Sequence, residues 1–224
     1  PANLSTILSN RRYSVGGDGI ILIEPSESAD AKMRMFNKDG SEGKMCGNGI
    51  RCVAKYLYDN KIAKHEKGIT VETLSGIKSI DIIEDGKNES ILKVKMDKPS
   101  FNPSDIPVIL NKDRIINEAI TIGGKKYYIT CVSMGNPHCV IFTEEDPMEL
   151  AVKYGPEIEK HEFFPEKTNT EFVKIKSNME IDMRVYERGC GITLACGTGA
   201  CASVVACVLN NLTEQKVKVN LLGG

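Results

Sequence analysis

Residues 33–49 read MRMFNKDGSEGKMCGNG, and residues 183–199 read MRVYERGCGITLACGTG. The two stretches align without a gap, so that Cys46 matches Cys196 and the glycines that follow also match. A duplicated stretch of sequence is expected to fold twice, and two such copies usually pack about a pseudo-two-fold axis. The duplication therefore predicts two similar domains, each carrying the same Cys-Gly-x-Gly loop, with the two loops facing each other across a cleft.

The hydrophobic pattern around these stretches predicts several strands and one loop-initiated helix in each half. Helices are expected over 48–58, 148–154 and 198–210, with Asn48 and Thr198 as the N-caps of the first and last. The last helix is apolar on nearly all sides, so we expect it to be enclosed on all sides. Alternating or β-branched runs predict strands over 19–24, 32–37, 69–73, 77–83, 91–96, 127–133, 138–143, 170–176 and 180–187.

These elements predict an α+β fold of two pseudo-symmetric domains, each a mixed β-sheet curved into a barrel around a central α-helix. The proline-rich segment 97–107, DKPSFNPSDIP, is the best candidate for a linker. We therefore expect domains over 1–98 and 105–224. Because strands at one end of each repeat have no counterpart in the other, we expect the first domain to lack its opening strands and the second its closing strands.

Composition narrows the class of function. The formal net charge is −1 and no dense block of lysine and arginine is present, which argues against a nucleic-acid or anionic-membrane partner. The longest apolar run, residues 200–209, is too short to span a membrane. Eight cysteines without a C-x-x-C pair, in a chain with three histidines, favour free thiols in a reducing cytoplasm over a disulfide scaffold or a metal site.

The Cys-Gly-x-Gly loop at a helix start suggests chemistry. Glycines let the backbone approach a ligand closely, and a helix N-terminus favours an anion such as a carboxylate or a thiolate. Lowering a thiol pKa from about 8.5 to about 7 takes about 2 kcal/mol, whereas a helix N-terminus typically supplies about 0.3–1 kcal/mol. A second group should therefore help each thiol, and His138 and Glu187 are the candidates.

Two such thiols suit a two-base proton transfer at the α-carbon of an amino acid. One thiolate would remove the α-hydrogen from one face, and the other thiol would deliver a proton to the opposite face. No cofactor is required by this scheme, and no cofactor motif is evident. A cysteine outside such a loop is more often a packing residue, and we read Cys52, Cys131, Cys139, Cys190, Cys201 and Cys207 in that way.

Six stretches resemble one known family closely: VGGDGI (15–20), FNKDGSEGKMCGNGIRC (36–52), SMGNPHCV (133–140), HEFFPEKTN (161–169), YERG (186–189) and ACGTGACA (195–202). Together they are similar to the diaminopimelate epimerase family, whose members act in lysine and peptidoglycan precursor synthesis without pyridoxal phosphate. The resemblance implies a fold of two similar barrel-like domains, a diaminopimelate substrate and a cytoplasmic location, and it leaves a homodimer open.

The resemblance also implies roles for individual residues. Cys46 and Cys196 would be the acid/base pair, tuned by His138 and Glu187, and Glu187 would also contact the substrate ammonium group. A planar arginine fork suits a second carboxylate. The implied substrate-binding residues are the backbone donors Gly47, Asn48, Gly197 and Thr198, and the distal-end binders Asn37, Asn136, Asn169 and Arg188.

Two rival functions remain open. A proline- or hydroxyproline-type racemase shares the fold and the two cysteines, but such enzymes usually carry histidine after the first Cys-Gly, where this chain has Asn48. A non-catalytic module of the same fold commonly lacks the cysteines, and both are present here.

Overall fold

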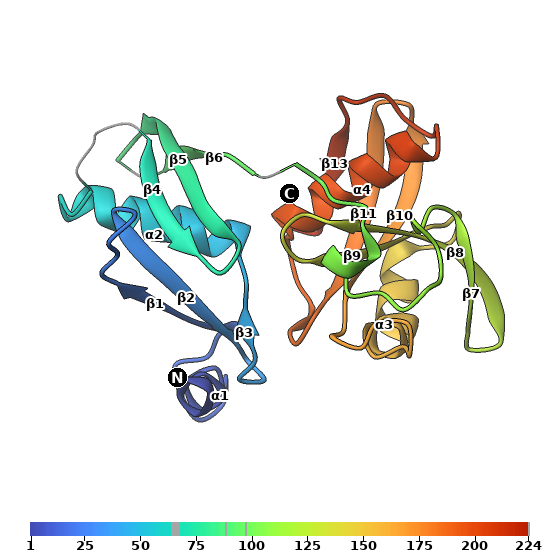
Figure 1. Cartoon of the computed structure of the whole chain (residues 1–224), viewed down its shortest axis with the longest axis horizontal. Helices are drawn as coiled ribbons and strands as arrows, with labels where there is room; N and C mark the ends of the chain where they lie inside the picture. Colours follow the sequence, from blue (N-terminus) through green and yellow to red (C-terminus); the bar gives the residue numbers. More distant parts are fainter. Residues whose placement is uncertain (64–67, 88, 97, 224) are drawn as a thin grey trace. The chain divides into compact units, whose positions relative to one another are not determined.

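The computed structural model describes residues 1–63, 68–87, 89–96 and 98–223. It divides into two compact units, Pro1–Asp97 (unit 1) and Lys98–Gly224 (unit 2) (Figure 1). Each unit is a curled sheet with a helix that begins directly after a cysteine, so the mixed α+β class expected from the sequence is confirmed.

Unit 1 is a mixed sheet with the strand order β1-β2-β4-β5-β6, and β3 pairs with β2. The β2–β4 pair is parallel and the other pairs are antiparallel. Its elements are α1 (Ala2–Leu8), β1 (Gly19–Glu24), β2 (Ala31–Asn37), β3 (Glu42–Gly43), α2 (Gly47–Asp59), β4 (Ile69–Thr73), β5 (Gly76–Asp85) and β6 (Ser90–Val94).

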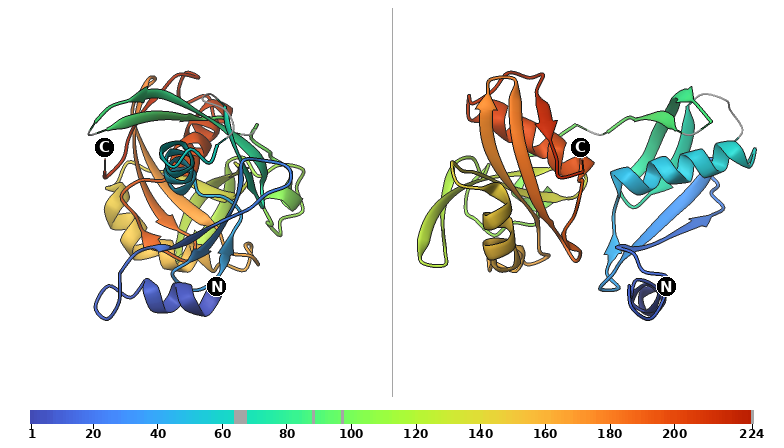
Figure 2. Two further views of the ribbon diagram at one scale, coloured as in Figure 1. Left: turned by 90° about the vertical axis from the view of Figure 1, so that its left-hand side faces the viewer. Right: turned by 180° about the vertical axis from the view of Figure 1, so that it is seen from behind.

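Helix α2 lies across one face of this sheet, as Figure 2 shows. Its buried side chains Ile50, Val53, Ala54 and Leu57 recur at intervals of three and one, which is the spacing of one helical face. They pack against strand residues of the same core cluster. The helix is therefore amphipathic, and its position fixes where the Cys46 loop lies relative to the sheet.

Unit 2 has the strand order β12-β11-β10-β9-β8-β7, and β13 pairs with β11. The β9–β10 and β11–β13 pairs are parallel. Its elements are a 3-10 turn, η1 (Pro103–Asp105), then β7 (Glu118–Ile122), β8 (Lys125–Ser133), β9 (Pro137–Phe142), α3 (Pro147–Glu159), β10 (Asn169–Ser177), β11 (Glu180–Glu187), β12 (Gly191–Ile192), α4 (Gly197–Leu209) and β13 (Lys218–Asn220).

The sheet of unit 2 is covered on both faces. Successive residues of a strand point to opposite faces, and on β10 Phe172 belongs to the core on the α3 side, whereas Val173 belongs to the core on the α4 side. Leu150 and Ile158 of α3 pack with Phe172. Asn169, Glu171 and Val173 therefore share the α4 face of the strand, which is the face that carries the cysteine loop.

Several expected elements differ in detail. Helix α3 runs to Glu159, beyond the expected end at 154, because the chain continues helically through Pro156. Helix α1 was not expected, since its seven residues are a short window and no side chain caps its start. The prediction that α4 is enclosed on all sides is wrong for the described residues: Ala202 and Ala206 are buried, but Val204 and Val208 are only half-buried, because the sheet covers one side of the helix.

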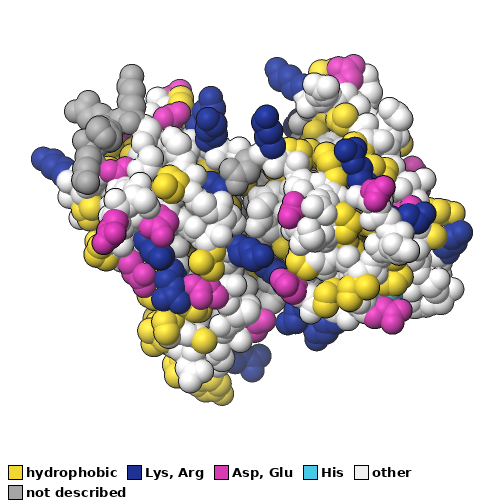
Figure 3. Space-filling view, viewed as in Figure 1, with side chains coloured by type: hydrophobic (Ala, Val, Ile, Leu, Met, Phe, Trp, Pro, Cys, Tyr) yellow, Lys and Arg dark blue, Asp and Glu magenta, His cyan; other side chains and the backbone are white. Residues whose placement is uncertain are grey.

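Exposed apolar side chains are present over α1, where Leu4 is 48% and Ile7 63% exposed (Figure 3). Such residues are ordinary on a protein surface when they occur singly. Among the described residues, none of the helices combines the length and the apolar character that a membrane crossing requires.

Candidate functional site

The two cysteine loops have the same local geometry. Cys46 is the N-cap of α2, with φ −135° and ψ 113°, and Cys196 is the N-cap of α4, with φ −128° and ψ 105°. In each loop the cysteine Sγ accepts a hydrogen bond from the backbone N–H three residues later, at 3.4 Å from Gly49 and 3.3 Å from Gly199. The cysteines, and not Asn48 and Thr198 as predicted, therefore cap these helices.

The position of each cysteine as the N-cap has a chemical consequence. An N-cap side chain lies at the positive end of the helix and satisfies one of its otherwise unbonded N–H groups. The sulfur of each cysteine thus receives a backbone hydrogen bond that favours its anionic form. Asn48 and Thr198 occupy the second helical position instead, where their backbone N–H groups are directed out of the helix start.

The two sulfurs differ in their surroundings. Cys46 is half-buried, whereas Cys196 is only 6% exposed. Burial raises the pKa of the Cys196 thiol well above its usual range, and the carboxylates of Glu187 and Glu171 raise that pKa further. The hydrogen bonds from Thr198 and Gly199 lower it. The expected help from Glu187 therefore acts in the opposite direction, and Cys196 is held as a neutral thiol.

Four of the predicted site residues are linked by side-chain contacts in unit 2, namely Asn136, His138, Thr198 and Cys196. Gly135, with φ 89°, forms the turn between β8 and β9 that sets Asn136 beside the start of β9. Asn136 Nδ2 donates to Thr198 Oγ1 at 3.2 Å, and Asn136 Oδ1 lies 3.0 Å from His138 Nε2. Thr198 Oγ1 lies 3.5 Å from Cys196 Sγ. Asn136 is thus engaged with the cysteine loop.

Asn169 and Arg188 are joined in a second group. Asn169 is 5% exposed, and its Nδ2 donates to the carbonyl of Pro137 at 2.7 Å. Its Oδ1 accepts from the backbone N–H of Arg188 at 2.9 Å. The Arg188 guanidinium donates to the Glu166 carbonyl at 3.3 Å. Asn169 therefore holds the turn that carries Arg188.

Glu187 lies at the end of β11, next to the same turn. Its Oε1 accepts a hydrogen bond from the Thr193 hydroxyl. The charge of Glu187 is one of the causes that raise the pKa of Cys196.

In unit 1, the predicted residues form two separate groups. Gly47 and Asn48 follow Cys46 in the first turn of α2, and Asn48 Oδ1 accepts from the Arg51 guanidinium at 2.8 Å. Asn37 ends β2 and is 7% exposed; its Nδ2 donates to Ser41 Oγ at 3.0 Å. Asn37 therefore supports the turn that follows β2.

Sequence reasoning missed Glu171. This residue is fully buried on β10, and its Oε1 lies 2.7 Å from Nδ1 of the equally buried His138. The available signal was a single acidic residue inside the strand sequence NTEFV, at a position that the alternation of side chains assigns to the same face as Val173. A buried carboxyl group that is not paired would be costly, so such a residue calls for a partner.

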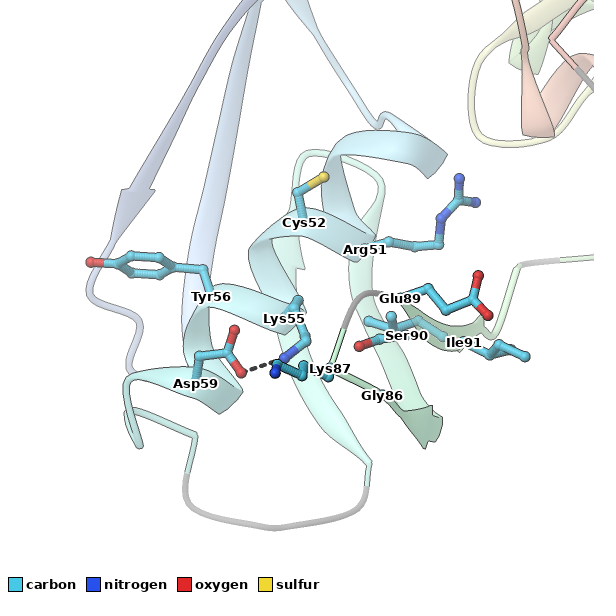
Figure 4. Close-up of a pocket in the computed structure, with 11 residues that line it drawn as sticks. Arg51, Cys52, Lys55, Tyr56, Asp59, Gly86, Lys87, Glu89, Ser90 and Ile91 are labelled. Carbon is cyan, nitrogen blue, oxygen red and sulfur yellow. Dashed lines mark hydrogen bonds and ion pairs between the residues drawn. The ribbon is translucent and has the colours of Figure 1, made fainter.

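An open groove of about 850 Å³ lies beside α2 in unit 1 (Figure 4). Its walls include Arg51 and Lys55 from the helix, and Glu89, Ser90 and Ile91 from the β5–β6 hairpin. None of the predicted site residues lines it. In the part of the chain that the structure describes, no group of three His, Cys, Asp or Glu side chains is arranged to hold a metal ion.

Comparison with known proteins gives evidence on the family of this chain. The family model described as diaminopimelate epimerase matches residues 1–102 and 130–224. A diaminopimelate epimerase from Agathobacter rectalis is 48% identical over 100% of this chain and 81% of its own length. One from Methanococcus maripaludis is 50% identical over 100% of this chain and 80% of its own length.

The fold also has relatives among solved structures. The crystal structure of a probable proline racemase from Agrobacterium radiobacter has a TM-score of 0.70 and 16% sequence identity, and the match covers 95% of this chain and 66% of that one. At this identity the likeness concerns the fold alone. The sequence matches, in contrast, cover the whole chain at nearly half identity, and both cysteine loops lie inside the matched residues. This chain belongs to the diaminopimelate epimerase family.

Proposed function

We propose that this chain inverts the α-carbon of diaminopimelate, interconverting the LL and meso forms, by proton transfer between two cysteines and without a cofactor. The observation that carries the proposal is the repeated loop, in which a cysteine caps a helix and its sulfur accepts the Gly49 or Gly199 N–H. One such loop would serve a single acid or base. Two copies supply both.

In the proposed reaction one cysteine acts as a thiolate and the other as a thiol. The thiolate takes the α-proton from one face of the carbon, and the thiol gives its proton to the opposite face. The substrate keeps its charge, no electron is transferred to an acceptor, and the two sulfurs exchange protonation states. Because burial raises the pKa of Cys196, we assign Cys196 the acid role in the resting enzyme, which leaves the base role to Cys46.

The first turns of α2 and α4 would bind the α-carboxylate. Backbone N–H groups at a helix start are directed at an anion placed there, and they stabilise the charge that develops as the carbon becomes planar. Gly47, Asn48, Gly197 and Thr198 supply these groups. Arg188, held by Asn169, would receive the distal carboxylate, and Glu187 would receive the ammonium group.

In a direct test, the purified full-length protein is incubated with LL-diaminopimelate, and the formation of the meso form is measured by chromatography. We expect the two stereoisomers to approach equilibrium without added metal or pyridoxal phosphate. Proline and trans-4-hydroxyproline are the comparison substrates. Racemisation of proline with none of diaminopimelate would assign the chain to the rival activity, and inactivity on all three would favour a non-catalytic module.

The proposed setting is lysine and peptidoglycan precursor synthesis in the cytoplasm, since diaminopimelate belongs to that chemistry. All eight cysteines are free thiols in the structure. A homodimer remains a proposal that a sedimentation measurement would test.

A further inference from the structure

Glu171 is a buried ionisable group that the proposed reaction does not use. It is fully buried, as is His138, whose Nδ1 lies 2.7 Å from Glu171 Oε1. A Cβ atom added at Gly199 would lie 2.7 Å from Glu171 Oε1 and 3.2 Å from Cys196 Sγ. The carboxyl group therefore lies against the turn of α4 whose N–H binds the cysteine sulfur.

A chain of hydrogen bonds connects Glu171 to that sulfur. It runs from Glu171 Oε1 to His138 Nδ1 at 2.7 Å, and from His138 Nε2 to Asn136 Oδ1 at 3.0 Å. It continues from Asn136 Nδ2 to Thr198 Oγ1 at 3.2 Å, and from Thr198 Oγ1 to Cys196 Sγ at 3.5 Å. All five residues belong to unit 2, and each link uses a side-chain atom.

The donors and acceptors along this series of hydrogen bonds follow one direction. An amide oxygen only accepts and an amide nitrogen only donates. With Asn136 Oδ1 facing the imidazole, His138 Nε2 must carry a proton and donate it. Asn136 Nδ2 then donates to Thr198 Oγ1, so that the Thr198 hydroxyl hydrogen is available for donation to the Cys196 sulfur at 3.5 Å. In this direction the sulfur can accept two hydrogen bonds, one from Thr198 and one from the Gly199 N–H.

The opposite direction would have a different result. If His138 carried its proton on Nδ1, Nε2 could only accept, and the Asn136 amide would have to turn over. Thr198 would then donate to Asn136 and accept from the Cys196 S–H group. The thiol proton would be tied into the protein instead of being available to the substrate carbon, and the thiolate would lose one donor.

Glu171 is the residue that can select between these directions. With a proton on Nε2, the Nδ1 atom must either accept from a protonated Glu171 or donate to its carboxylate as part of an imidazolium. In both cases one proton lies between Nδ1 and Oε1, and the pair is neutral. Glu171 Oε2 is buried with no hydrogen-bond partner among the described residues, so a neutral pair costs less than an isolated buried carboxylate.

We propose that Glu171 is a positioning residue for Cys196, which holds His138 with a proton on Nε2 and so keeps a hydrogen-bond donor directed at the cysteine sulfur. The inference rests on the proposed function in taking Cys196 as a reacting thiol. Its test does not require turnover, so that a failure of this inference and a failure of the proposed function give different results.

The first measurement is the ring-nitrogen NMR spectrum of the full-length protein with ¹⁵N-labelled histidine. The chain has only three histidines, so a His138→Gln sample assigns the signals. We expect the His138 Nε2 nitrogen to be protonated at neutral pH and to stay so in Glu171→Gln, because the glutamine amide can donate to Nδ1. A wild-type spectrum with a bare Nε2 and a protonated Nδ1 would overturn the proposal.

The second measurement is the rate of iodoacetamide alkylation at Cys196, resolved from the other thiols by peptide mass spectrometry. We expect Glu171→Gln to react at least as fast as wild type, because the glutamine amide keeps the hydrogen bond to Nδ1 and lacks the charge that raises the Cys196 pKa. We expect Glu171→Leu, which can neither donate nor accept, to slow alkylation about tenfold. Thr170→Val is the matched control, since it removes a buried hydroxyl from the same strand but from the opposite face; its rate should not change.

Alkylation that is slowed as much in Glu171→Gln as in Glu171→Leu would mean that the hydrogen bond to Nδ1 does not act through the chain of hydrogen bonds, and would overturn the proposal. A double-mutant comparison tests whether Glu171 acts on Cys196 through the series of hydrogen bonds or through the stability of the protein. Thr198→Val cuts the chain at its last link, so adding Glu171→Leu to it should slow alkylation little further. If the two effects instead multiply, Glu171 acts on stability and not through the chain, and the proposal fails. Should Glu171→Leu not fold, the Glu171→Gln rate and spectrum decide.

Discussion

The Cys46 loop of unit 1 and the Cys196 loop of unit 2 share a backbone but not an environment. Both cysteines cap a helix with nearly the same φ and ψ, and both sulfurs accept the N–H three residues later. Cys46 is half-buried and precedes an amphipathic helix, whereas Cys196 is 6% exposed and is surrounded by Glu171, Glu187 and Thr198. Both copies thus keep the geometry that polarises a thiol, while the surroundings differ and raise the pKa of the Cys196 thiol.

The largest expected effect tests whether the two loops are equivalent in the reaction. We expect Cys46→Ser and Cys196→Ser each to lower the rate of epimerisation by about 10³-fold, because a hydroxyl is a far weaker acid than a thiol and each face of the carbon needs its own group. Steady-state assays of both variants, with circular dichroism to confirm folding, measure this. If either variant kept more than a tenth of the wild-type activity, its cysteine would not be needed for the reaction, and the two loops would not be equivalent.

Substitution of the glycine that binds each sulfur should separate the two environments. In Gly199→Ala the new Cβ would lie 2.7 Å from the Glu171 carboxylate and 3.2 Å from Cys196 Sγ, so we expect a loss of about 2–3 kcal/mol in the free energy of unfolding. In Gly49→Ala the Cβ would collide with Cδ1 of Ile21, which is 36% exposed and can turn away, and would lie at ordinary contact distance from Cys46 Sγ (3.4 Å) and Met33 Cε (3.5 Å).

For Gly49→Ala we therefore expect a loss of about 1 kcal/mol or less, partly offset by the higher helix propensity of alanine. Urea unfolding of both variants checks the difference. Equal losses would show that the surroundings of the two loops constrain this position alike.

The pH dependence of stability should reflect the buried thiols of unit 2. Burial raises the pKa of Cys139 and Cys196 well above the usual range and the pKa of Cys207 to about 11. Because the folded state holds these protons more tightly, the stabilisation is complete below the unfolded pKa of about 8.5 and is lost as the pH rises from there toward the folded values.

Each such thiol contributes a slope of about 1 kcal/mol per pH unit in that range. Urea titrations at pH 9 and pH 10 should show the free energy of unfolding falling, and the Cys207→Ala variant should fall by about 1 kcal/mol less than wild type. An unchanged slope in that variant would mean that Cys207 is not buried as described.

The smallest effects are expected at the first helical position of each loop. A Cβ added at Gly47 or Gly197 meets nothing within 4 Å. We expect Gly47→Ala and Gly197→Ala to change the free energy of unfolding by about 0.5 kcal/mol in the stabilising direction, since alanine restricts the unfolded chain. A loss of more than about 1 kcal/mol in either variant, measured by urea unfolding, would show a constraint that the loop geometry does not reveal.

Much of the fold followed from local pattern, because a repeated sequence repeats its structure and because strand and helix periods are distinct. The strand over residues 180–187 and the helices after Cys46 and Cys196 were expected and are present. The caps were assigned wrongly, since asparagine and threonine are stronger cap formers than cysteine by propensity alone. The position of the sulfur at the helix start became visible only in three dimensions.

The candidate site was less accessible to sequence reasoning, for a similar reason. Asn136, Asn169 and His138 were expected at the site, but their pairings with Thr198, Pro137 and Glu171 depend on strand register. Register brings residues from separate strands together and leaves no local mark. Burial likewise decided the protonation of Cys196 against the helix N-terminus, and the burial of one side chain depends on packing from the whole unit.

The central claim is that two different thiols serve the two faces of one carbon, and deuterium labelling in D₂O tests it most directly. At low conversion of LL-diaminopimelate, the meso product should carry one deuterium at the inverted α-carbon, while the recovered substrate keeps its hydrogen, because the group that removes a proton is not the group that returns one. Equal labelling of recovered substrate and product at the same early time would show a single exchanging base, and would contradict the account.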